Sequence, residues 1–253
     1  MPPRNHLHRL NSCSNEHVRL YCFPFAGGSA SAYRPWAHIA PPGIGLTAYQ
    51  LPGRAERLGE TAATDIHAVV PGIAAIVADD IDDRPYGLFG HSMGATYAYE
   101  VALELRRLGV APPRLVALSG RRAPHRQLER LQSYSALPDS LFLEKIQGLG
   151  GTPVQLLENP DLLELVLPTL RTDFLADETY QAPAVAQLDC PFLMFGGAQD
   201  LLTPVPDLRA WSELSAARAA THVYPGGHFF LWNHASEMLR LIAAELFNSC
   251  VNQ

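Results

Sequence analysis

The chain has 253 residues, a length that a single α/β domain commonly reaches and that supports a sizeable core. Its formal charge is −6, from 19 basic and 25 acidic residues, which argues against nucleic-acid binding. No apolar run is long enough to cross a membrane, and the polar, His-rich start lacks the apolar segment of a secretory signal. We therefore expect a cytoplasmic protein that does not enter a membrane.

Short apolar runs alternate with amphipathic stretches, a pattern typical of βαβ units on a parallel sheet. In chain order, the expected strands are Arg19–Phe25, Gly45–Leu51, Tyr86–Gly90, Leu115–Ser119, Phe192–Phe195 and Thr221–Tyr224. The expected helices between and after them are Ser31–Ala40, Asp65–Asp80, Gly94–Leu108, Pro204–Ser215 and His234–Asn248. Residues 1–17 read as a flexible tail, and residues 18–253 as one doubly wound domain.

One segment interrupts this alternation, because about 70 residues after Ser119 contain no clear strand. We expect a helical insertion over about residues 121–187, with helices at Leu137–Leu149 and Asn159–Leu175 and a hinge-like joint at Gly148–Pro153. Its apolar face comprises Leu141, Phe142, Ile146, Leu162, Leu165, Val166 and Phe174. This face predicts a lid over a ligand chamber; the alternative is a helical subdomain that only adds core.

The segment Gly90-His91-Ser92-Met93-Gly94 matches the pattern G-x-S-x-G between an expected strand and an expected helix. In that context the serine lies on a strained turn, and the glycines allow backbone segments to cross closely. Ser92 is therefore the candidate nucleophile.

A serine hydroxyl needs a histidine base, and the histidine needs an orienting carboxylate. Asp200 and His228 each follow an expected strand, at the sheet edge where open α/β sheets bind ligands. They are the candidate acid and base.

Other acids and histidines fit these roles less well. Asp207 lies in an expected helix, Asp189 precedes its strand, His222 lies within a strand, and His234 opens the last helix. His91 is expected to pack or to form hydrogen bonds beside Ser92.

The tetrahedral intermediate of acyl transfer needs two backbone N–H donors. We expect one from Met93, which follows the nucleophile, and the other from Ala26 in the turn after the first strand, with Phe25 as the less favoured choice. Phe25 and Phe229 are candidates for the wall of the substrate pocket.

Neither metal binding nor disulfide chemistry is predicted. His6 and His8 could form a metal pair but lie in the expected tail. The four cysteines, Cys13, Cys22, Cys190 and Cys250, lack the spacing of a zinc site or a disulfide framework.

Together these features resemble the α/β-hydrolase fold, and more narrowly the type II thioesterases that accompany polyketide and nonribosomal peptide synthases. The matching stretches are Leu20–Gly28, Gln50–Arg54, Gly87–Ala95, Pro191–Asp200 and Gly226–Phe230. They span nearly the whole chain. One departure is Ala55 directly after Leu51-Pro52-Gly53-Arg54, where relatives often have an acidic or amide residue.

The resemblance implies that Ser92, Asp200 and His228 form the triad and that the Ala26 and Met93 amides form the oxyanion hole. It implies hydrolysis of acyl thioesters on the phosphopantetheine arm of a transiently bound acyl or peptidyl carrier protein, with no cofactor of the enzyme's own. The short stretch before the first strand favours a free-standing protein.

Arg121, Arg122, Arg126 and Arg130 could meet an acidic carrier protein or form an ordinary solvated face. Two other functions stay open: a lidded esterase or fatty-acyl or coenzyme A thioesterase for small free substrates, and a non-catalytic binding module on the same fold.

Overall fold

The computed structural model describes residues 6–11, 15–126, 133–151, 159–182 and 186–248. Its centre is a seven-stranded sheet in the order β1-β3-β2-β4-β5-β6-β7. The strands are β1 (Leu7–Arg9), β2 (Val18–Phe23), β3 (Ile44–Tyr49), β4 (Tyr86–His91), β5 (Leu115–Ser119), β6 (Phe192–Gly197) and β7 (Ala219–Tyr224). All neighbouring pairs are parallel except β1 with β3. The six strands expected from the sequence are therefore confirmed, with small differences at their ends.

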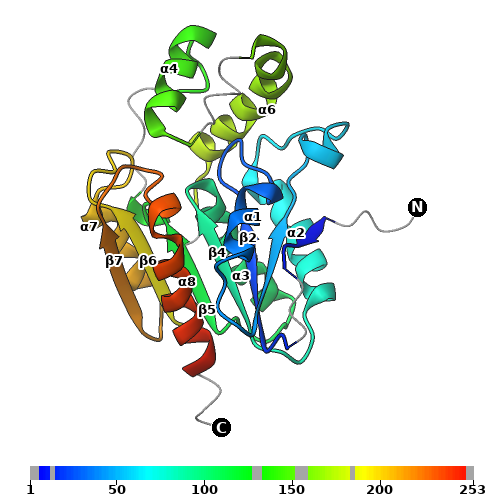
Figure 1. Ribbon diagram of the computed structural model, residues 1–253, viewed down its shortest axis with the longest axis vertical. Helices are drawn as coiled ribbons and strands as arrows, with labels where there is room; N and C mark the ends of the chain where they lie inside the picture. The colour runs from blue at the N-terminus through cyan, green and yellow to red at the C-terminus, as the bar shows by residue number, and fades with distance from the viewer. Residues whose placement is uncertain (1–5, 12–14, 127–132, 152–158, 183–185, 249–253) are drawn as a thin grey trace.

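The helices cover both faces of the sheet (Figure 1). The α-helices are α1 (Arg34–Ala37), α2 (Ile66–Asp80), α3 (Met93–Arg107), α4 (Asp139–Leu149), α6 (Pro160–Thr179), α7 (Val205–Arg209) and α8 (Leu231–Asn248). Short 3-10 helices occur at η1 (Ala30–Tyr33), η2 (Ala55–Arg57), η3 (Pro124–Arg126) and η4 (Ala210–Leu214). Two expected single helices are thus divided: the first becomes η1 with α1, and the one after β6 becomes α7 with η4.

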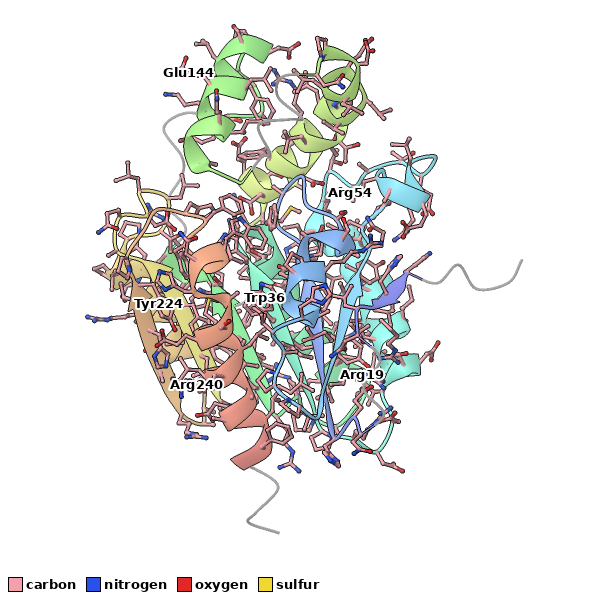
Figure 2. The ribbon with its side chains drawn as sticks, in the orientation of Figure 1. Arg19, Trp36, Arg54, Glu144, Tyr224 and Arg240 are labelled. Atoms are coloured by element: carbon pink, nitrogen blue, oxygen red, sulfur yellow. The ribbon has the colours of Figure 1, made fainter. Side chains whose placement is uncertain are left out.

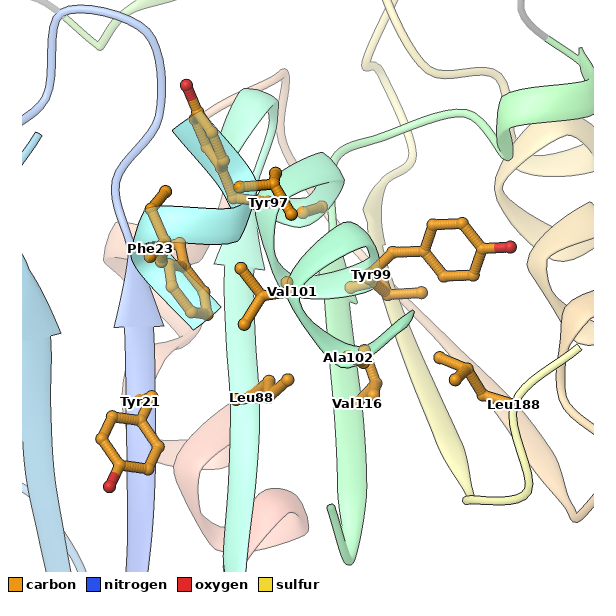
Figure 3. Close-up of a cluster of buried hydrophobic side chains, with 14 of the residues drawn as sticks. Tyr21, Phe23, Leu88, Tyr97, Tyr99, Val101, Ala102, Val116 and Leu188 are labelled. Carbon is orange, nitrogen blue, oxygen red and sulfur yellow. The ribbon is translucent and has the colours of Figure 1, made fainter. Parts of the chain in front are cut away.

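Alternation of side chains along the strands divides the core into two layers. On one face, Tyr21 and Phe23 of β2 pack with residues of α2 and α3. On the other face, Leu20 and Cys22 pack with residues of η1, α1 and α8. Figure 3 shows the first layer, in which Leu88 lies beside Val101 of α3. Because parallel strands are buried on both faces, they read as continuous apolar runs in the sequence.

The N-terminal segment differs from the expected flexible tail. Leu7–Arg9 form β1, which pairs antiparallel with β3 and places Leu7 opposite Tyr49. His8 contacts Glu56 through a hydrogen bond of 2.5 Å. A three-residue edge strand with a single buried apolar side chain carries no recognisable alternation, so the sequence could not show it.

Helices α4 and α6 stand beyond the carboxyl ends of the central strands (Figure 1). They pack on each other through a small cluster in which Phe142 and Phe174 meet edge to face at 5.3 Å between ring centroids. Gly150 ends α4 in the left-handed conformation, and the expected joint continues into residues 152–153, outside the described part. Leu141, Leu162 and Leu165, expected on the apolar face, are instead exposed, although Leu165 also lines the cavity described below.

In the described parts of the chain, no helix is both long and apolar enough to cross a bilayer. Cys22 and Cys190 are buried free thiols, and burial raises the pKa of the Cys190 thiol to about 12. Cys13 and Cys250 lie outside the described residues. The two described thiols are therefore core side chains.

Candidate active site

Ser92 occupies a sharp turn between β4 and α3, with φ of +53° and ψ of −124°. The flanking glycines make this turn possible, because a Cβ at Gly90 would lie 1.9 Å from the Gly94 carbonyl oxygen. A Cβ at Gly94 would lie 2.2 Å from the Phe23 carbonyl oxygen. The Ser92 N–H donates to the Ser119 carbonyl oxygen at 2.8 Å, which ties the turn to β5. The strand–turn–helix context predicted for the motif is confirmed, and Ser92 holds a conformation that is costly for a non-glycine residue.

Asp200 and His228 follow neighbouring parallel strands, β6 and β7, and meet at the same sheet edge. Nδ1 of His228 lies 2.8 Å from Oδ2 of Asp200, and both residues are buried. The other carboxylate oxygen accepts the N–H groups of Leu202 at 2.9 Å and Thr203 at 3.3 Å. Because an ionised carboxylate only accepts hydrogen bonds, Nδ1 carries the proton and Nε2 is left as a free acceptor.

Ser92 and His228 both line a cavity of about 280 Å³. Its apolar walls come largely from the lid helices α4 and α6 and include Ile146, Leu149, Leu165, Val166, Leu170 and Phe174. Among the described residues, Ser92 and His228 share no hydrogen bond; catalytic hydrogen bonds are often long in unliganded enzymes. The prediction that the insertion covers a chamber is confirmed by this lining.

The turn after β2 forms another part of the cavity wall. The Gly28 N–H donates to the Phe25 carbonyl oxygen at 2.8 Å, and Gly27 has a φ of +75°. Ala26 lines the cavity, and Met93 is the first residue of α3. In the described part of the chain, neither the Ala26 nor the Met93 N–H is engaged in a hydrogen bond. Two backbone donors thus remain available beside Ser92.

Phe25 and Phe229 both line the cavity, as predicted for pocket residues. Their rings meet edge to face with 4.9 Å between centroids. Phe229 also stacks on the Trp232 ring at 6.1 Å. These contacts fix a rigid aromatic wall next to His228.

His91 is fully buried, and its Nδ1 lies 2.9 Å from the Ser119 hydroxyl. Burial lowers the pKa of His91 well below 6.5, and the positive charge that His228 can carry lowers it further. His91 is therefore neutral, and the prediction that it packs beside Ser92 is confirmed.

The other weighed residues lie apart from this site. Asp207 is in α7 and pairs with Arg122 at 2.7 Å, and His222 lies within β7. His234 lies in the first turn of α8, with Nε2 3.2 Å from the Pro225 carbonyl oxygen. In the described structure no hydrogen bond or ion pair joins any of them to Asp200, His228 or Ser92.

Sequence reasoning missed a buried ion pair at the edge of the site. Arg54 donates two hydrogen bonds to Asp173 of α6, from Nη1 at 2.5 Å and from Nη2 at 2.7 Å. Arg54 lies in a stretch that resembles the family, but the sequence assigns no role to it or to Asp173. Two features of the sequence could have indicated the pair. Arg54 has no assigned partner, and the Asp173 carboxylate lies on the apolar side of an expected lid helix, directly before Phe174.

Of the four arginines considered as either a carrier-binding surface or a solvated face, the structure rules out Arg121 for both. Arg121 is buried and pairs with Asp177 at 2.7 Å, so it cannot meet a partner protein. Arg122 pairs with Asp207 and also donates to the Leu202 carbonyl oxygen. Arg126 is exposed and lies 3.4 Å from Glu213, and Arg130 lies outside the described residues.

The fold and site define an α/β hydrolase with a helical lid, and comparisons place it more narrowly. The thioesterase domain family matches residues 18–246, and the chain belongs to that family. The gramicidin S biosynthesis protein GrsT of Aneurinibacillus migulanus is 35% identical over 232 residues, covering 90% of this chain and 89% of GrsT. The thioesterase PikA5 of Streptomyces venezuelae is 34% identical over 241 residues, covering 95% of this chain and 85% of PikA5.

A solved structure agrees with this family. The type II thioesterase BorB from the borrelidin biosynthetic cluster superposes with a TM-score of 0.88 at 31% identity, covering 96% of this chain and 98% of BorB. The resemblance to type II thioesterases of polyketide and nonribosomal peptide systems is confirmed, as is the α/β-hydrolase fold.

Proposed function

We propose that this protein is a discrete editing thioesterase that removes aberrant or stalled acyl groups from the phosphopantetheine arm of carrier proteins. The observation that carries the proposal is the placement of Ser92 and the Asp200–His228 pair at one apolar cavity beneath a helical lid. GrsT, named for gramicidin S biosynthesis, and BorB, a type II thioesterase from the borrelidin biosynthetic cluster, support a carrier-bound substrate. We propose accordingly that the enzyme works in the cytoplasm, beside the synthase.

In the acylation half-reaction, Nε2 of His228 takes the proton of the Ser92 hydroxyl as Oγ attacks the thioester carbonyl carbon. The carbonyl oxygen becomes an oxyanion that the N–H groups of Ala26 and Met93 stabilise. Collapse of this intermediate breaks the carbon–sulfur bond. His228 returns the proton to the departing thiolate, which leaves as the thiol of the carrier arm.

In the deacylation half-reaction, His228 takes a proton from water as the water oxygen attacks the acyl-serine. The second tetrahedral intermediate uses the same two amides. Its collapse breaks the bond between the acyl carbon and Oγ of Ser92, and His228 returns its proton to Oγ, which releases the acid and restores the Ser92 hydroxyl. Asp200 holds the imidazole with its proton on Nδ1 and stabilises the imidazolium in both halves. The residues themselves supply the nucleophile, the base and the oxyanion donors, so we propose a reaction without a cofactor.

The chamber supports a broad rather than a selective hydrolase. Most of its lining side chains are aliphatic or aromatic, and such side chains distinguish acyl chains by about 1–3 kcal/mol per methylene. A weak preference suits an enzyme that must clear different stalled groups. A sharp preference for one chain length in hydrolysis assays would contradict an editing role.

The test is to load a carrier protein with an acyl-phosphopantetheine arm and to follow loss of the acyl group by intact mass. The same acyl group on a small thiol and on a small alcohol gives the comparison, and Ser92→Ala gives the background. We expect rapid, Ser92-dependent loss with higher kcat/KM on the carrier. Turnover confined to small substrates would instead favour a lidded esterase or a coenzyme A thioesterase.

A fluorophosphonate probe separates an enzyme from a non-catalytic binding module. An activated serine reacts with the probe, whereas an ordinary hydroxyl does not. We expect one label on the wild-type chain and none on Ser92→Ala. An unlabelled wild-type protein would contradict the proposed catalysis altogether.

A further inference from the structure

The turn at residues 25–28 is held by hydrogen bonds to two side chains, Asp173 and Arg54, that have no part in the proposed reaction. The Gly27 N–H donates to Oδ2 of Asp173 at 2.7 Å. The Gly28 carbonyl oxygen accepts from Nη1 of Arg54 at 3.0 Å. One ion pair therefore fixes both a donor and an acceptor of the turn that contains Ala26.

The ion pair is buried and ordered by several contacts. Only 8% of Arg54 and 3% of Asp173 is exposed. Nε of Arg54 donates to the Pro52 carbonyl oxygen at 3.2 Å, and the Thr169 hydroxyl of α6 donates to the Gly53 carbonyl oxygen at 2.8 Å. Figure 2 shows Arg54 at the level where the lid helices meet the sheet. Helix α6 is thus attached at the same place to the Arg54 loop and to the turn.

The conformation of the turn explains why an acceptor is needed there. A φ of +75° at Gly27, with Gly28 bonded back to Phe25, is that of a type II turn. Its alternative, a type I turn, rotates the peptide bond between Ala26 and Gly27 and exchanges the positions of its N–H and carbonyl groups. The Asp173 carboxylate accepts the N–H and repels a carbonyl oxygen, so it selects one of the two turns.

The Ala26 N–H belongs to the preceding Phe25–Ala26 peptide bond, which has the same orientation in both turns, so Asp173 can act on it only by holding the turn in place. We propose that Asp173 is a positioning residue that, through the Gly27 N–H, anchors this turn where the Ala26 N–H meets the oxyanion, and that Arg54 holds the Asp173 carboxylate for this purpose. Because Asp173 belongs to lid helix α6, the position of the lid and the readiness of the oxyanion site are coupled. This inference rests on the proposed function, since it takes Ala26 as an oxyanion donor.

The first experiment measures kcat and KM with a small activated thioester, which removes carrier docking from the comparison. Asp173→Ala removes the acceptor, and we expect kcat to fall about 10- to 100-fold with KM nearly unchanged. That loss is smaller than the roughly 10²- to 10³-fold effect of deleting an oxyanion donor, because the Ala26 amide is displaced rather than removed. Asp139→Ala is the matched control, because it removes the carboxylate that pairs with Arg171 of α6 from the start of α4 without touching the turn. We expect wild-type kcat for this control.

A second variant distinguishes a loss of kcat caused by the missing acceptor from one caused by a loss of stability. Arg54→Met/Asp173→Ala leaves no unpaired buried charge, so it should regain thermal stability relative to Asp173→Ala. We expect its kcat to stay low, because the acceptor for the Gly27 N–H is still missing. Recovery of kcat together with stability would overturn the proposal.

A further readout is binding of a trifluoromethyl ketone, which forms a tetrahedral oxyanion adduct with the serine. We expect its affinity to fall in Asp173→Ala by the same factor as kcat/KM, while a non-hydrolysable thioether analogue binds as in the wild type. Equal losses for both compounds would show a merely structural role. If Ser92→Ala abolishes turnover and Asp173→Ala does not lower it, only this inference fails; if Ser92→Ala stays active, the proposed function fails.

Discussion

The imidazole rings of His91 and His228 lie 4.9 Å apart between centroids, yet their environments give them different roles. His228 has a carboxylate partner in Asp200, whereas His91 is fully buried against the Ser119 hydroxyl. Burial lowers the pKa of His91 well below 6.5, so it stays neutral when His228 takes up a proton. A second positive charge beside the proposed base is thereby avoided.

This depressed pKa predicts a stability change in acid. The unfolded chain protonates His91 near pH 6.5, but the folded chain does so only at much lower pH. The contribution of His91 to stability is therefore fully present above pH 6.5 and is lost as the pH falls below it, by at most about 1.4 kcal/mol per pH unit. Thermal unfolding between pH 5 and 8 should show a shallower decline for His91→Asn than for the wild type. Identical slopes would contradict the assignment.

Replacement of Asp200 by asparagine should leave the fold intact and lower kcat about 10³- to 10⁴-fold. The reason is that an amide can donate to Nδ1 of His228, which favours the tautomer with its proton on Nε2, so that Nε2 no longer accepts the Ser92 proton. Stopped-flow measurement of acyl-enzyme formation should show the loss in the first chemical step. Asp207→Asn, which affects only the pair with Arg122, serves as the control and should retain kcat. Comparable rates for the two variants would exclude Asp200 as the orienting acid.

Two glycine-to-alanine variants should have opposite effects on stability. A Cβ at Gly90 would lie 1.9 Å from backbone, so Gly90→Ala should destabilise the protein by more than about 3 kcal/mol or prevent folding. Gly72 lies inside α2 with open space around its Cβ position, and Gly72→Ala should stabilise by roughly 0.5–1 kcal/mol. Urea unfolding of both variants tests the pair. A stable Gly90→Ala would show that the turn at Ser92 is looser than these distances indicate.

Charge reversal should affect the stability of the protein very differently at Arg121, which is buried, and at Arg126, which is exposed. Arg121→Glu leaves Asp177 without its buried cation and should cost about 3–5 kcal/mol. Arg126→Glu changes an exposed side chain and should alter stability by no more than about 0.5 kcal/mol. We also expect carrier-bound turnover of Arg126→Glu to match the wild type. Reduced turnover at unchanged stability would restore Arg126 as a docking residue.

Local patterns were sufficient for much of the fold. The six longer strands are apolar runs because a parallel sheet is covered on both faces, and the short strand β1 escaped notice because it buries little. Gly90 and Gly94 signalled the turn at Ser92 because close backbone contacts exclude any larger side chain there. Asp200 and His228 were identified by position, since loops after parallel strands converge on one sheet edge.

The sequence by itself thus determined the succession of strands and helices along the chain, the candidate nucleophile and the family resemblance. All three depend on residues that are neighbours in the sequence. Only the tertiary structure decided which distant charges pair. Arg54 and Asp173 are 119 positions apart, and Arg121 and Asp177 are 56 apart. An ion pair requires two side chains within about 4 Å, a condition set by how α6 packs over the sheet rather than by local periodicity. That packing buries Arg121 in a pair with Asp177 and attaches the lid to the oxyanion turn through Asp173.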